Sequence, residues 1–183
     1  MKNSLKIFAA LLFLAVFSNT ALAQVTLTGN DAGAELVKVL TITNTTPLYF
    51  GRLGITSGVA GTVVMNTAGD RTPGEATTTI ISTGTPKTVA QFNIGGTAST
   101  AYSIGLPTTI AVKTGVGTGN YATTIGTLMV KVDAAAEATA VGATGTLAVG
   151  GGSSFLMSGT LVIGSAQELG IYTGHYDVTV DYQ

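Results

Sequence analysis

Apolar and polar residues alternate in short runs along this chain, and clusters of Gly, Pro, Asn and Asp separate the runs. The clearest run is the last one, over residues 175–182. Its apolar members occupy every second position and are Tyr176, Val178, Val180 and Tyr182. A period of two is that of a β-strand with one buried face, so we expect these four side chains to lie in the core.

Runs punctuated in this way predict about ten strands in an antiparallel sandwich or barrel. The candidate strands cover residues 35–43, 48–53, 61–66, 77–82, 89–94, 101–106, 109–113, 127–132, 144–149, 154–163 and 175–182. Within the tenth of these, Gly159 predicts a bulge or a close backbone approach. Asp133 could cap an Ala-rich turn over residues 133–140, but a helix of that length is marginal alone, so we interpret the segment as a loop.

The first 23 residues have the pattern of a secretory signal peptide. Two lysines precede an apolar run over residues 7–17, and Ala21-Leu22-Ala23 supplies the small residues that signal peptidase requires. The apolar run is shorter than the roughly 20 residues that cross a bilayer, so we expect no stable membrane insertion. We therefore predict an exported protein of the periplasm, cell surface or extracellular space, in which residues 24–183 form a single domain.

The composition narrows the range of partners. Charged residues make up 9% of the chain, whereas an average domain has about a quarter. Removal of Lys2 and Lys6 with the signal peptide shifts the formal charge from −1 to −3, which argues against binding to nucleic acid. The chain has no cysteine, so its stability must come from burial and sheet pairing. A surface with so few charges is common where chains pack against one another.

Residues for acid, base or nucleophilic chemistry are scarce. His175 is the only histidine, it falls on the polar side of its predicted strand, and no serine lies in a Gly-x-Ser-x-Gly elbow. Asp177 and Asp181 share that polar side, but four residues of strand place them about 13 Å apart, too far for either glycosidase geometry. We therefore predict that the protein is not an enzyme.

Neither a metal nor a nucleotide site is predicted. Asn30 and Asp31 form a short acidic turn that no calcium-binding loop follows. Gly115-Val-Gly117-Thr-Gly119 lacks both the glycine spacing and the following helix of a nucleotide fingerprint. We expect no metal ion and no cofactor.

Three motifs resemble a known family. They are Leu48-Tyr49-Phe50-Gly51, Ala90-Gln91-Phe92-Asn93-Ile94-Gly95-Gly96 and Gly170-Ile171-Tyr172-Thr173-Gly174-His175-Tyr176-Asp177-Val178-Thr179-Val180. In this order they resemble the exported bacterial family catalogued as domain of unknown function 4402, and more distantly the spore-coat-U-like proteins and chaperone–usher pilins. The resemblance spans nearly all of residues 24–183. It implies an Ig-like β-sandwich and, through the pilins, subunits that lend a strand to a neighbour's open sheet edge. Pilins often hold a disulfide, which this chain lacks.

The predicted first strand has apolar side chains on both faces. Leu36, Leu40 and Ile42 lie on one face, and Val37 and Val39 lie on the other. Such a strand needs cover on both sides. Either it is the first strand of its own sandwich, or the segment from Gln24 onward leaves its domain and completes the sheet of the next subunit. The sequence leaves both interpretations open, because it cannot show whether a sheet edge is free.

Export, low charge and the pilin-like motifs lead us to expect a structural subunit of a bacterial cell-surface fibre or coat. Its partners would be further copies or related surface subunits, with a periplasmic chaperone before assembly. The main alternative is a monomeric secreted module that binds a ligand such as a glycan, with Tyr102, Tyr121 and Tyr172 as candidate contacts. An exported enzyme that uses His175 is a third hypothesis.

Overall fold

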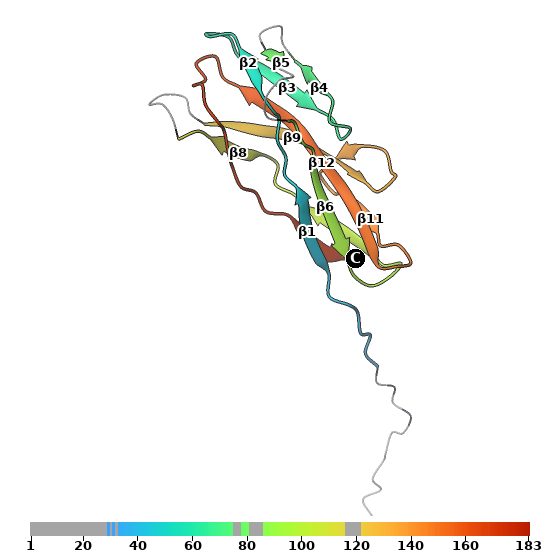
Figure 1. Cartoon of the computed structure of the whole chain (residues 1–183). Helices are drawn as coiled ribbons and strands as arrows, with labels where there is room; N and C mark the ends of the chain where they lie inside the picture. The colour runs from blue at the N-terminus through green and yellow to red at the C-terminus, as the bar shows by residue number, and fades with distance from the viewer. Residues whose placement is uncertain (1–28, 30, 32, 75–77, 81–85, 116–121) are drawn as a thin grey trace, which may run out of the picture. The chain divides into compact units, whose positions relative to one another are not determined.

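The computed structural model of the chain describes residues 29, 31, 33–74, 78–80, 86–115 and 122–183 (Figure 1). The predicted signal peptide lies outside these residues. The chain divides into two units, residues 1–36 and residues 37–183, and every described strand belongs to the second unit. None of the described residues forms a helix long and apolar enough to cross a membrane.

The strands of the described residues follow one another along the whole second unit. They are β1 (Thr41–Thr46), β2 (Leu53–Ile55), β3 (Gly61–Met65), β4 (Arg71–Pro73), β5 (Thr78–Ile80), β6 (Ala90–Gly95), β7 (Ala101–Gly105), β8 (Ile110–Lys113), β9 (Ala122–Val132), β10 (Ala138–Thr139), β11 (Thr144–Thr146), β12 (Gly152–Ile163) and β13 (Thr179–Tyr182).

These strands form two main antiparallel sheets in a sandwich-like arrangement. The long strand β12 runs through the larger sheet (Figure 1), where its first half pairs with β6, its second half with β3, and its other edge with β9. β1 lies beside β6, β4 beside β3, and β8 and β10 beside β9. The second sheet has the order β11-β7-β13, and β2 pairs with β5. The all-β antiparallel architecture expected from the sequence is confirmed.

Apolar side chains of both sheets fill the core. In β3 and β6 every second residue is buried, as a strand with one inward face requires. The largest fully buried side chains include Tyr102, Phe155, Met65, Leu147 and Met157. The alternating residues of the C-terminal run lie half-buried against this core: Tyr176, Val178, Val180 and Tyr182.

Gly159 lies where the register between β12 and β9 shifts, between Ser158 and Thr160. On the facing strand, Thr127 has a positive φ of 45°. A Cβ atom on residue 159 would lie 3.0 Å from the carbonyl oxygen of Gly126, closer than side chains normally approach. The close backbone approach, one of the two alternatives predicted for this glycine, is confirmed, and the extra residue of the register shift lies opposite it in β9.

Several predicted strands are shorter in the structure, because strand formation needs a partner as well as a favourable sequence. Residues 35–40 have no strand pairing, and the first strand begins at Thr41. In the last predicted strand only Thr179–Tyr182 is paired. Residues 133–140 form turns and the short β10 without any helix, as the loop interpretation predicted.

Other predicted boundaries were wrong. The run at 48–53 holds only an isolated bridge between Tyr49 and Thr88, and the paired strand starts at its last residue. The run at 144–149 is paired only over its first three residues. β4 and β10 carry no alternating pattern and were not predicted, because their pairing is imposed by β3 and β9. Residues 77, 81 and 82 of another predicted strand lie outside the described residues.

Candidate functional site

The edge strand β1 forms one wall of a groove. β1 pairs with β6 along one of its edges, and among the described residues no strand pairs with its other edge. Ile42, Asn44, Pro47 and Leu48 line the groove from this side. They place both apolar side chains and unpaired backbone beside the opening.

The segment 174–178 forms the opposite wall. The isolated bridge between Lys113 and Thr173 ends just before it, and the pairing of β13 with β7 starts just after it, at Thr179. Within the described part of the chain, residues 174–178 take part in no strand ladder. The backbone of residues 174–178 is therefore not paired in a ladder with any described strand.

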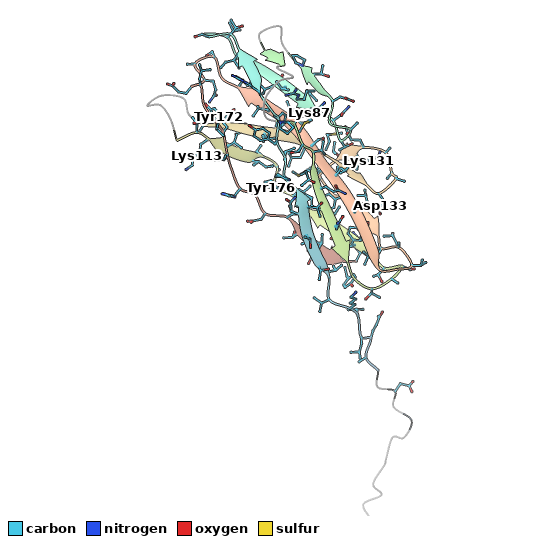
Figure 2. The ribbon with its side chains drawn as sticks, viewed as in Figure 1. Lys87, Lys113, Lys131, Asp133, Tyr172 and Tyr176 are labelled. Atoms are coloured by element: carbon cyan, nitrogen blue, oxygen red, sulfur yellow. The ribbon has the colours of Figure 1, made fainter. Side chains whose placement is uncertain are left out.

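Apolar side chains form the floor of the groove between the two walls. Phe92 of β6 reaches it from the core, and Tyr176 and Val178 line it from the C-terminal wall. Figure 2 shows Tyr176 beside the end of β1. Burial raises the pKa of the Tyr176 hydroxyl above its ordinary value. The groove therefore offers an apolar floor between the unpaired edge of β1 and a segment that belongs to no ladder of the described residues.

A second hollow lies on the other flank of the same segment. Its lining includes Leu106, Pro107 and Thr109 after β7, together with His175 and Asp177. The side chains of His175 and Asp177 are exposed. Residues 175–177 thus line both hollows.

Tyr182 joins the two walls at one end. Its hydroxyl donates a hydrogen bond to the carbonyl oxygen of Lys38 and accepts one, 2.7 Å long, from the backbone N–H of Thr97. The N–H of Lys38 donates to Oγ1 of Thr97 at 2.7 Å. We call Tyr182, Lys38 and Thr97 the latch. A Cβ atom on Gly96 would lie 2.5 Å from the Tyr182 hydroxyl, so glycine at that position makes room for it.

The two walls run in opposite directions. The latch joins Lys38 to the end of the chain at Tyr182, whereas the groove lies between residues 42–48 and 174–178. Later residues of the first wall therefore face earlier residues of the second. The latch lies before β1 in the chain, and the groove lies beyond it, along β1.

The five residues predicted for a donor or first strand fall into two groups. Leu40 and Ile42 are half-buried and pack against the core of their own domain. Leu36, Val37 and Val39 are exposed, by 94%, 49% and 79%. The exposed apolar residues thus flank Lys38 of the latch: Leu36 and Val37 lie before it, and Val39 follows it.

The groove itself could not be found from the sequence. Phe92 and Leu48 were assigned to ordinary strands, and only the fold brings them to the same opening as residues 174–178. Asn44 and Pro47 carry no pattern of their own. The sequence offered one signal, Gly174. In the structure this glycine marks the start of the second wall, directly after the bridge of Thr173 with Lys113.

A polar cluster elsewhere resembles a catalytic arrangement but is fully occupied in structural bonds. Ser153 donates to Oδ2 of Asp133 at 2.6 Å, so the Tyr102 hydroxyl, 2.6 Å away, is the donor to the serine oxygen. Oδ1 of Asp133 accepts from the backbone N–H of Ser154 at 2.7 Å. Burial raises the pKa of Tyr102; the hydrogen bond to Ser153 opposes this rise, and the charge of Asp133 adds a smaller rise. The cluster ties β7 to the start of β12.

The remaining candidates of the sequence do not gather at one site. Tyr102 is fully buried, and the hydroxyl of Tyr172 donates to the carbonyl oxygen of Glu168 at 2.7 Å. Tyr121 and Asn30 lie outside the described residues. Asp31 is exposed. Among the described residues, no group of three or more His, Asp or Glu side chains could hold a metal ion.

Comparison with known proteins identifies one family. A family model described as a domain of unknown function, DUF4402, matches residues 40–182. The match begins just before β1 and ends at the last residue of β13, so it covers the sandwich and both walls of the groove. No curated protein matches the chain, and no solved structure matches it.

Proposed function

Since this chain belongs to the DUF4402 family, we propose a role that rests on its groove: it is a structural subunit of a bacterial cell-surface fibre or coat, assembled by strand addition. In this proposal residues 1–23 direct export, residues 24–183 form the mature subunit, and the sandwich is of the Ig-like type. The open groove between β1 and residues 174–178 is the observation that carries the proposal.

Unpaired strand edges favour the addition of another strand. Exposed N–H and C=O groups along an edge form a template for pairing, and stable proteins normally cover or blunt such edges. An incoming strand would bond to both walls and place alternate side chains over Phe92, Tyr176 and Val178. Each apolar side chain that it buries fully contributes about 1.5–3 kcal/mol. The groove thus supplies both backbone bonds and apolar contact.

The composition agrees with this role. Only 9% of the residues are charged, so copies that pack together would meet little charge repulsion or desolvation cost. The chain has no cysteine, so an assembly of its copies cannot rest on disulfides between them. Before assembly the open edge is an aggregation hazard, for which a periplasmic chaperone is the expected partner.

Purified mature protein tests the proposal directly. We expect multimers that persist in detergent at room temperature and dissociate on heating. A matched variant without residues 24–33 should remain a folded monomer, as judged by its circular dichroism spectrum and its elution volume. Strictly monomeric mature protein at high concentration would count against the proposal, as would producing cells whose surface looks the same with and without the protein.

A further inference from the structure

The latch fixes the chain at Lys38 through both of its backbone polar groups. The N–H of Lys38 donates to Thr97, and its carbonyl oxygen accepts from Tyr182. Thr97 follows β6 of the larger sheet, and Tyr182 ends β13 of the second sheet. The latch therefore binds the chain to both layers of the sandwich, directly before β1.

This position restricts how the preceding residues can reach their own groove. The groove begins after the latch, at Ile42, and extends toward Leu48. With Lys38 held, the chain before it must reverse at once and run back beside β1 to enter. A reversal of that kind is a tight hairpin, which favours Asn-Gly, Asp-Gly or Gly at its turn. The residues at that point are Leu36 and Val37.

The register of such a hairpin is also unfavourable. A two-residue turn at Leu36 and Val37 would place Asp31 opposite Ile42 and Gly29 opposite Asn44. A carboxylate, that of Asp31, and a glycine, Gly29, would then face the apolar floor. The alternating pair Val25 and Leu27 would reach only the far end of the groove, opposite residues 48 and 46.

A second copy faces no such restriction. Its residues 24–36 form a segment of 13 residues, about 43 Å when extended, whereas the six residues of β1 span about 20 Å. This length is enough to fill the groove and still leave a linker to the next domain. Val25 and Leu27 can then take whichever register places them over Phe92.

We infer that the latch of Tyr182, Lys38 and Thr97 commits the N-terminal segment, residues 24–36, to the groove of a second copy instead of its own. This inference rests on the proposed function. It names a second copy of the chain as the partner and the latch as the feature that favours insertion between copies. With the latch closed, insertion within one copy needs a strained turn in the wrong register. With the latch open, several more residues before β1 are free to form the turn. Insertion within one copy then competes with insertion into a second copy.

Disulfide trapping can separate the two outcomes, because the natural chain has no cysteine. Leu27→Cys marks the segment, and His175→Cys marks the wall of the groove, where the histidine is exposed. A disulfide requires Cα atoms within about 7 Å, so it reports insertion specifically. Mixed single variants can form only bridges between copies. The double variant, oxidised at high dilution, forms a bridge within one copy if the segment folds back.

We expect mixed single variants to give the bridged dimer and the diluted double variant to stay largely open. Adding Tyr182→Phe to the diluted double variant should raise the fraction bridged within one copy at least about fivefold, because one lost hydrogen bond accounts for about that factor and the variant removes both the bond to Lys38 and the bond from Thr97. Thr97→Val, which removes the other anchor of Lys38 and keeps the side-chain shape, should act in the same direction. It serves as the second test if Tyr182→Phe does not fold.

Tyr172→Phe is the matched control. It removes a tyrosine hydroxyl that also donates to a backbone carbonyl, that of Glu168, outside the residues that line the groove. It should leave the fraction of bridges within one copy unchanged. An equal increase with Tyr172→Phe would overturn the latch, as would no increase with both Tyr182→Phe and Thr97→Val.

Failure of the proposed function gives a different result. If the natural chain never multimerises, but Tyr182→Phe still raises bridging within one copy, the fibre role is wrong and the latch stands. If multimers form and mixed single variants give no bridge, the fibre role stands and the assignment of the segment to this groove is wrong.

Discussion

The rings of Phe92 and Phe155 stack with 4.8 Å between their centroids and 14° between their planes. The two residues are direct partners in the register of β6 and β12. Phe155 is 1% exposed. Phe92 is 5% exposed and also forms the floor of the groove. The stack therefore connects the centre of the larger sheet to the site where we propose that a strand docks.

Phe155→Ala should lower the free energy of unfolding by about 3–5 kcal/mol, because it leaves a cavity in the core and removes the stacked ring. Urea unfolding followed by circular dichroism measures the change. Val64→Ala is the control, since that valine lies on the neighbouring strand β3 and is 43% exposed; its cost should stay below about 1 kcal/mol. Equal costs for the two variants would contradict the core assignment.

Two adjacent glycines before β12 should respond oppositely to substitution. Gly151 has a φ of +76°, and a Cβ atom there would lie 2.5 Å from the carbonyl oxygen of Gly96. Gly151→Ala should therefore cost about 2 kcal/mol or more of stability in thermal unfolding. A Cβ atom on Gly150 meets nothing within 4 Å, so Gly150→Ala should change the free energy by no more than about 0.5 kcal/mol. A harmless Gly151→Ala would show that the turn has another conformation.

The sequence predicted what depends on local pattern and missed what depends on partners. Runs of strand-forming residues located β3 and β6 to within one residue, and Gly159 marked a close backbone approach, because residue composition and the lack of a Cβ atom are local properties. The open edge was missed, since residues 174–178 carry the same alternation as the paired β13. Only the position of β7 decides which part of that run is paired. The latch was missed for the same reason: Lys38 and Tyr182 are 144 residues apart.

Alkaline pH should destabilise the domain through two tyrosines. Burial raises the pKa of Tyr102 and Tyr176 in the folded state above the ordinary value of about 10. Below pH 10 both states are protonated and stability is unaffected. As pH rises above about 10, the unfolded chain loses protons first, so the free energy of unfolding falls until the folded pKa is passed.

Unfolding in urea between pH 9 and about 11.5 measures this fall. Tyr176→Phe should reduce the slope of stability against pH, because the burial that raises its pKa then has no ionisable group to act on. Tyr102→Phe should also reduce the slope, although it loses the bond to Ser153 at every pH. A slope that is the same in the natural chain and in both variants would show that other groups cause the fall.

A synthetic peptide of residues 24–36 should bind to a variant that lacks the same residues. Because the variant keeps both walls of the groove, the peptide can add as a strand and stabilise the folded state by mass action, by about 2.7 kcal/mol at a hundredfold excess over its Kd. Thermal unfolding with increasing peptide concentration measures the shift in Tm. A control peptide with Asp in place of Val25 and Leu27 keeps the length and removes the alternating apolar pair, so it should give no shift. Equal shifts for the two peptides would mean that binding does not use the apolar floor, and no shift for either at millimolar concentration would place the docking strand elsewhere.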